Sequence, residues 1–260
     1  MSLLSGLSEQ KVELAQEADV LGGQSGPIPS GLYSMAITMA YLSKSAGGAL
    51  GLTVWGEAQL PNGGTREIKQ TEYVTSGDAK GNKKFYVAKD GASKPLPGYS
   101  WANNLCILAN ETPLEGVETA IKTVKIYNYD AGQEMPEDKE VLVGLIGKKV
   151  IAGVQHQLQN KNAKNQNTGS YEPTYDDQGN PVTKELNVID KMFHAVSKQT
   201  VAEAIGNSPA SFYDKWDAKF SGEVVSKLVK GSAPVKAANS GAFTGSPAAA
   251  PQPVTSLFSS

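Results

Sequence analysis

The chain has few of the residues from which enzymes build reactive sites. Its 260 residues include one cysteine, Cys106, and two histidines, His156 and His194. A lone cysteine cannot form an internal disulfide, and neither histidine has a Cys, Asp or Glu at the spacing of a zinc site. No glycine-rich loop is followed by the Lys-Ser/Thr pair that cradles phosphates in nucleotide-binding enzymes. We therefore expect no enzymatic activity, no metal and no cofactor.

The sequence also lacks a long apolar run and an excess of positive charge. No apolar stretch approaches the about 18 residues of a membrane-spanning helix, and no signal-like segment opens the chain. The formal net charge is -2 at pH 7, unlike the basic domains that read duplex DNA. A local positive stripe is still compatible with this total, because a binding surface needs only local charge. The composition is typical of a soluble globular protein, which we expect in the cytoplasm.

Composition divides the chain into three segments. Residues 1–26 are expected to form an N-terminal helical arm, because apolar residues recur near helical spacing over 8–21. Residues 27–231 contain the periodic apolar patterns of a folded domain. Residues 232–260 consist mainly of Ala, Pro, Ser and Gly, which is typical of a disordered tail.

The domain begins with apolar alternation at a period of two. Residues 31–41, 49–60 and 66–75 each alternate and are separated by turn-forming residues, which predicts a three-stranded antiparallel meander. Such a meander suits a closing or partly open barrel. Further patterns predict strands over 122–129, 148–158 and 187–196, a helix over 136–146, a short helical turn over 200–205, and a mobile polar stretch over 159–186. Residues 211–230 fit either a strand or a helix. We expect a mainly β fold with a few short helices and long loop insertions.

Residues 81–110 place aromatic rings among lysines on a Gly/Pro-rich segment without periodicity. The rings are Phe85, Tyr86, Tyr99 and Trp101, and the lysines are Lys83, Lys84, Lys89 and Lys94. Exposed rings among lysines suit a single strand of nucleic acid, whose bases stack on rings while its phosphates meet ammonium groups. The alternative is a long surface loop whose rings pack onto the core. Cys106, in the apolar run 105–109, is expected to be buried.

The aromatic residues of the meander divide into expected core residues and expected surface residues. Tyr33 and Tyr41 share a predicted face with apolar residues and are expected in the core. Trp55 and Tyr73 lie opposite the apolar faces of their strands, on a surface that also carries Lys69. Rings there either serve a second core or offer a stacking platform, and we favour the platform. Lys148 and Lys149 add further positive candidates.

The order of motifs resembles that of the single-stranded-DNA-binding proteins of double-stranded-DNA bacteriophages. The opening GLYSMAITMAYLSKSAGGALGLTVW is similar to their first hairpin, and GNKKFYVAKDG followed by LPGYSWANNLCILA to their insertion with an LPG-aromatic motif. NVIDKMFHAVSKQTVAE resembles their late strand and short helix, and FYDKWDAKFSGEVVSKL their closing strand. Together these patterns span about Gly31 to Lys230.

This resemblance implies an OB-fold β-barrel that coats single-stranded DNA without sequence specificity during phage DNA replication and recombination. It implies the cytoplasm of the infected bacterial host as the location, and recruitment of phage or host replication and transcription proteins through the C-terminal tail. Family members commonly have an acidic tail, whereas no Asp or Glu follows Glu223 in this chain. The apolar pair Leu257 and Phe258 is the expected partner contact.

The expected contacts with single-stranded DNA combine the aromatic and lysine candidates. They are Trp55, Lys69, Tyr73, Lys83, Lys84, Phe85, Tyr86, Lys89, Tyr99, Trp101, Lys148 and Lys149. The alternative function is that of a β-rich protein-interaction or virion component, which would use Leu257 and Phe258 and bind no nucleic acid.

Overall fold

A computed structural model of the protein describes residues 26–128, 131–165, 169 and 171–229. Within these ranges the chain forms two compact units. The first contains residues 26–159 and 184–227, and the second contains residues 160–183 together with 228 and 229. The predicted helix over 8–21, the predicted tail over 232–260, Leu257 and Phe258 all lie outside the described residues.

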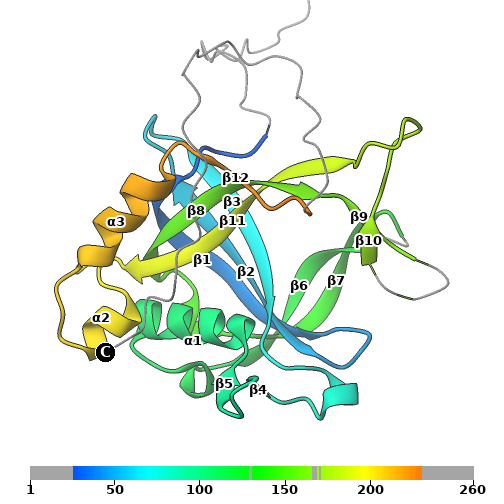
Figure 1. The fold of residues 1–260 in the computed structure, drawn as a ribbon. Helices are drawn as coiled ribbons and strands as arrows, with labels where there is room; N and C mark the ends of the chain where they lie inside the picture. The colour runs from blue at the N-terminus through cyan, green and yellow to red at the C-terminus, as the bar shows by residue number, and fades with distance from the viewer. Residues whose placement is uncertain (1–25, 129–130, 166–168, 170, 230–260) are drawn as a thin grey trace, which may run out of the picture. The chain divides into compact units, whose positions relative to one another are not determined.

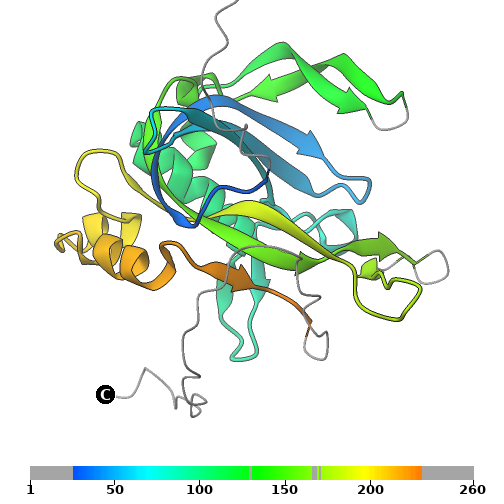
Figure 2. The same ribbon diagram turned by 90° about the horizontal axis from the view of Figure 1, so that it is seen from above.

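The first unit is a curled, mixed β-sheet. Its path is β11 (Thr183–His194), β8 (Lys149–Asn160), β1 (Gly31–Lys44), β2 (Leu50–Gln59) and β3 (Thr65–Tyr73). The hairpin of β6 (Ala120–Asn128) and β7 (Gln133–Val141) joins β1 through β7, and β12 (Val224–Ser226) runs parallel to β8. Figures 1 and 2 show the sheet curling into a half-barrel. The predicted meander and the mainly β class are confirmed, and no ladder between β3 and β11 closes a barrel in the described part of the chain.

A bulge in β1 changes which face its side chains serve. Ile37 pairs with Gly56 and Met39 with Trp55, which leaves Thr38 as an extra residue in β1. Because one extra residue reverses the alternation, side chains switch sides at this point. Residues 33, 35 and 37 therefore lie in the main core, whereas Tyr41 lies in a second cluster on the opposite face. Both tyrosines are buried as predicted, but the prediction that they share a face is wrong.

The main core lies between the inner face of the sheet and α1 (Pro97–Asn110). α1 starts with Pro97 in its first turn, where the missing N–H costs no hydrogen bond. It buries Ala102, Leu105 and Cys106 completely. At Gly98 a Cβ would lie 2.3 Å from the carbonyl oxygen of Tyr73, so only glycine permits this approach of helix and strand.

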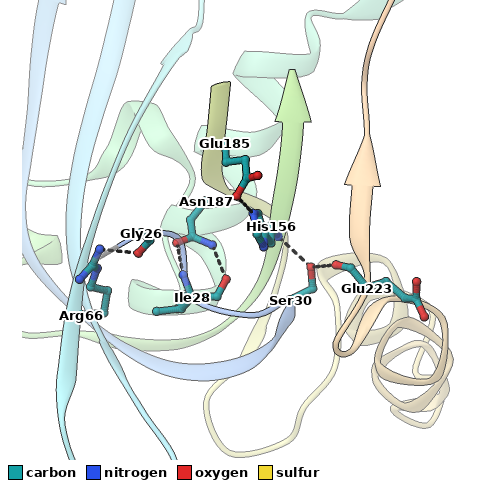
Figure 3. A network of polar contacts seen from close by, with 8 residues as sticks. All are labelled: Gly26, Ile28, Ser30, Arg66, His156, Glu185, Asn187 and Glu223. Atoms are coloured by element: carbon teal, nitrogen blue, oxygen red, sulfur yellow. Dashed lines mark hydrogen bonds and ion pairs between the residues drawn. The ribbon is translucent and has the colours of Figure 1, made fainter. Parts of the chain in front are cut away.

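Side-chain amides bridge the seam between the edge strands β3 and β11. The Gln70 Oε1 accepts the Ile189 N–H at 2.7 Å, and the Gln70 Nε2 donates to the Ile189 carbonyl at 3.3 Å. Further along β11, the Asn187 amide bonds both the N–H and the carbonyl of Ile28, at 2.8 and 2.9 Å (Figure 3). Arg66 of β3 donates to the Gly26 carbonyl at 2.6 Å. These bonds fasten the half-barrel where strand pairing does not.

The second cluster lies beneath the β6–β7 hairpin. Tyr41, Val124 and Val141 are its buried members, and the Tyr41 and Trp55 rings meet edge to face with centroids 6.2 Å apart. The predicted helix over 136–146 is wrong. Its residues form most of β7, which pairs with β6 over nine positions, and then the 3₁₀ turn η3 (Val143–Leu145). Burial alternates over the second half of β7, where Glu137 and Lys139 are partly buried and Val141 is buried, which is typical of a strand rather than a helix.

Two short helices follow β11. α2 (Val201–Ile205), which was predicted, begins with a capping box between Thr200 and Glu203. α3 (Ser211–Phe220) presses Trp216 against β8, where a Cβ on Gly153 would lie 3.0 Å from the indole ring. The open prediction over 211–230 is thereby resolved as a helix followed by β12.

Ser30 connects the start of β1 to the strands on either side. Its hydroxyl accepts the His156 N–H at 2.7 Å and donates to the Glu223 carbonyl (Figure 3). Along one edge of β8, β1 pairs as far as Val154, opposite Gly31, and β12 takes over from His156, opposite Val224.

The second unit is a small β-structure within the stretch that was expected to be mobile. β9 (Asn162–Lys164) pairs with β10 (Tyr171–Pro173), and Tyr175 forms a bridge with Pro181. Backbone bonds of 2.8 Å link Lys161, Thr174 and Val182. Its described residues thus contain defined strands and turns.

Replacing Gln70 by alanine should lower the free energy of unfolding by about 1–3 kcal/mol, because the Ile189 N–H would lose its acceptor in a partly buried seam. Urea unfolding followed by circular dichroism measures the change. Gln133→Ala, at an exposed position of β7, is the control and should change stability by less than about 0.5 kcal/mol. Equal effects of the two substitutions would contradict a fastening role for Gln70.

Candidate nucleic-acid interface

The segment richest in predicted contacts folds as a β-hairpin followed by α1. β4 (Phe85–Val87) pairs with β5 (Ser93–Pro95), and the 3₁₀ turn η1 (Asp78–Lys80) precedes them. In the connecting turn, the Asp90 carboxylate accepts the Ala92 N–H at 3.0 Å. The expectation of a non-periodic segment over 81–110 is therefore wrong, because it contains two strands and a helix.

The β4–β5 hairpin is exposed, aromatic and basic. Phe85 and Tyr86 are 40% and 44% exposed. Residues 80–95 include five exposed lysines and one exposed carboxylate: Lys80, Lys83, Lys84, Lys89, Lys94 and Asp90. Lys94 pairs with Asp90 at 3.2 Å, and the Lys83 ammonium lies 5.8 Å from the centroid of the Phe85 ring. A protein with a net charge of -2 thus has a locally positive hairpin with rings between its lysines.

Two predicted contact residues in this region are held by a third residue. The Glu115 carboxylate, in the 3₁₀ turn η2 (Leu114–Gly116), bonds the Lys84 ammonium at 2.5 Å and the Tyr99 hydroxyl at 2.7 Å. The Lys84 ammonium also lies 4.9 Å from the centre of the Tyr99 ring. Hydrogen bonds from Lys84 and then Tyr99 lower the pKa of Glu115 to about 2. Lys84 and Tyr99 therefore pin the hairpin to α1 and η2.

Trp101 lies at the seam of the half-barrel. Its ring is partly buried against the main core, and its Nε1 donates to the Ile189 carbonyl at 3.0 Å. It also lines a cavity of about 790 Å³, together with Asn104 of α1, Phe212 of α3 and residues of β3 and β11. The Nε1 of Trp101 thus stabilises the seam, and its side chain also borders the cavity.

The outer face of β2 and β3 contains the other predicted aromatic residues. Trp55 packs against the second cluster, and the Lys69 ammonium lies 4.7 Å from the centre of its ring. Tyr73 is 52% exposed and lies across the strand pair from Gly51. Of the two alternatives for this face, the second core accounts for Trp55, whereas Tyr73 is exposed enough to meet a ligand.

Tyr73 lies close to the β4–β5 hairpin. The turn after β3 bonds the base of the hairpin, because the Ser76 N–H donates to the Lys83 carbonyl at 2.9 Å. The backbone of Tyr73 also touches Gly98 at the start of α1. Lys148 and Lys149 are exposed at the start of β8, in a different part of the sheet.

A basic and aromatic surface around α3 was missed by the sequence analysis. Three lysines lie over aromatic rings there, at 4.7 to 5.4 Å from the ring centres: Lys191 over Phe212, Lys198 over Tyr213 and Lys219 over Phe220. The helical spacing of SFYDKWDAKF was the available signal, and leaving this segment undecided obscured it. Acidic residues of the same helix, Asp214 and Asp217, make this surface mixed in charge.

Cys106 and His156 lie outside these surfaces, whereas His194 lies beside Lys198, whose N–H donates to the His194 carbonyl at 3.0 Å. Cys106 is buried as predicted, and burial raises the pKa of its thiol to about 12, so it is not a nucleophile near neutral pH. His156 pairs with Glu185 at 2.9 Å (Figure 3). Among the described residues, no three His, Cys, Asp or Glu side chains gather as a metal site would require.

Comparisons with known proteins give no match: no family model, curated protein or solved structure is similar to this chain. In the described part of the chain, no helix has both the length and the apolar character needed to cross a membrane.

The Glu115 pin predicts a pH-dependent stability in acid. The folded pKa, about 2, lies below the ordinary value of 4.5, so the stabilisation is complete above about pH 4.5 and is lost as the pH falls toward 2. Glu115→Gln should remove this part of the pH dependence, which thermal unfolding between about pH 5 and pH 2 measures. Glu111→Gln, an exposed glutamate at the end of α1, is the control. An unchanged profile in Glu115→Gln would contradict the pin.

Proposed function

We propose that the protein binds and coats single-stranded DNA without sequence specificity, as a phage protein of DNA replication and recombination in the cytoplasm of the infected bacterial host. The biological setting rests on the sequence resemblance. So does the proposal that Leu257 and Phe258 of the tail recruit replication or transcription proteins. The half-barrel would correspond to an open form of the OB-fold.

The proposal rests mainly on the exposed rings and lysines of the β4–β5 hairpin. Its rings offer stacking surfaces, and stacking is tolerant of sequence because every base has a π-face. Its lysines can meet phosphates at the same time, and a locally positive element is sufficient in a protein of negative total charge. A duplex hides the faces of its bases, so this combination favours single strands.

The proposed contacts differ in weight according to their surroundings. Tyr73, Phe85 and Tyr86 would stack on bases, since all three rings are substantially exposed. Lys83 and Lys89 would meet phosphates, whereas Lys94 is paired with Asp90. Lys84, Tyr99, Trp55 and Trp101 would act mainly by positioning, because each already has partners within the protein.

Fluorescence anisotropy of a labelled oligo-dT strand tests the proposal. The label belongs on the DNA because Trp216 is buried and Trp55 and Trp101 are partly buried, which makes intrinsic fluorescence a weak reporter. Binding should be much stronger to the strand than to a matched duplex. With about three to five phosphates contacted, log affinity should fall against log salt with a slope of about -2 to -3.5. Equal binding to duplex, or no binding to either, would contradict the proposal.

Removing the rings of the hairpin should weaken binding with little effect on folding. Phe85→Ala and Tyr86→Ala should each cost about 1–3 kcal/mol of binding free energy, the usual value of one stacked base. Val87→Ala is the matched control, because Val87 is a 67% exposed, non-aromatic neighbour on the same strand. If Val87→Ala weakens binding as much as the ring variants, stacking at the hairpin is excluded.

The lysines of the hairpin should act through charge alone. Lys83→Gln and Lys89→Gln should weaken binding to every strand similarly and reduce the salt slope by about 0.7 for each phosphate that is no longer neutralised. Lys122→Gln, an exposed lysine of β6, is the control and should leave the slope unchanged. Anisotropy titrations at several salt concentrations make the comparison, and an unaltered slope in the hairpin variants would contradict a phosphate role.

A further inference from the structure

The second unit exposes two aromatic rings that the sequence analysis did not consider. Tyr171 and Tyr175 are 71% and 61% exposed, the highest values of any aromatic residue among those described. Both belong to the stretch expected to be mobile, whose described residues instead form β9, β10 and a tight turn. Exposed aromatic rings on an ordered element offer flat faces on which unpaired bases can stack.

Strand pairing places Tyr171 on one face with a lysine. Tyr171 lies directly opposite Lys164, and Pro173 opposite Asn162, so these four side chains share a face of the hairpin. Tyr175, two residues beyond Pro173, lies outside β10 and forms a separate bridge with Pro181. At about 3.3 Å per residue, the two tyrosines lie roughly 13 Å apart along the chain.

Two carboxylates of the second unit are held by hydrogen bonds, and a third, Asp177, is exposed in the turn that follows Tyr175. Glu172 lies on the opposite side of β10, where it accepts a bond from the Asn165 amide at 3.0 Å. The Asp176 carboxylate is turned into the next turn, where it accepts the N–H groups of Gln178 and Asn180 at 3.0 and 2.8 Å. Glu172 is thus kept off the face that Tyr171 and Lys164 share.

We propose that Tyr171, Tyr175 and Lys164 form a second binding site for single-stranded nucleic acid. The rings would stack on unpaired bases and Lys164 would meet a phosphate. The inference rests on the proposed function. The bonds of Asp176 and Thr174 fix the turn next to the rings, which reduces the ordering that binding would otherwise require.

Paired variants test the second site against strands of two lengths. In the full chain, Tyr171→Ala with Tyr175→Ala should weaken binding of a dT strand of about 30 nucleotides by about tenfold or more. Binding of a strand of about six nucleotides should change less than about twofold, because the β4–β5 hairpin alone can hold it. Tyr171→Phe with Tyr175→Phe keeps both rings and should bind both strands as the wild type does.

Each outcome bears on a different claim. If the double alanine variant binds the long strand as tightly as the wild type does, the second site alone is overturned. The same holds if the double alanine and double phenylalanine variants lose equal affinity for the long strand. Failure of the wild type to bind any single strand would overturn the proposed function together with this inference.

A fluorescence reporter gives an independent readout. Tyr171→Trp should gain a tryptophan signal, measured relative to the wild type, that the long dT strand quenches. Val196→Trp, at an 84% exposed position of the first unit, is the control and should show no added quenching. Quenching that is equal in the two variants would overturn stacking at Tyr171.

Discussion

The bulge at Thr38 is the constraint on which the two faces of the first unit depend. With the extra residue, the first half of β1 directs its apolar side chains into the main core, and the second half directs Tyr41 to the opposite face. The Thr38 hydroxyl bonds the Trp55 carbonyl at 3.2 Å across the bulge. Tyr41 and Trp55 then form the base on which β6 and β7 pack. With unbroken alternation, Tyr41 would lie on the side of the main core instead of on this face.

That arrangement also decides which rings are available to a ligand. Trp55 is half-buried in the second cluster, and Trp101 is tied to the seam through Ile189. The rings of the β4–β5 hairpin are exposed instead, on an element whose base is bonded to the end of β3 and whose Lys84 is bonded to Glu115. A hairpin anchored on both sides presents its rings with little freedom, so binding would lose little conformational entropy.

Elements with strong alternation could be predicted from the sequence. β1, β2, β3, β6, β8 and the helix α2 lie close to the expected ranges, because their patterns are local and unambiguous. The failures arose where a residue type had two roles. Proline favoured a loop in the segment 81–110, although Pro97 starts α1. The acidic residues around Glu137 suggested the start of a helix, although they lie in the strand β7.

The candidate site was predictable in composition and less so in geometry. Exposed Phe85 and Tyr86 among lysines agree with the pattern of the sequence. The partners of Lys84 and Tyr99 could not be anticipated, because Glu115 lies 31 residues from Lys84 in the chain and meets it only in the folded protein. The bulge at Thr38 was likewise invisible, since an extra residue in an apolar alternating strand leaves no distinct signature.

Lysine footprinting of the intact protein tests the central claim most directly. Acylation of each lysine would be measured by mass spectrometry with and without a saturating dT strand. We predict that Lys83 and Lys89 of the β4–β5 hairpin become protected, whereas Lys122 and Lys125 of β6 react at unchanged rates. Hairpin lysines that react equally with and without the strand would contradict the assignment of this hairpin as the DNA-binding surface.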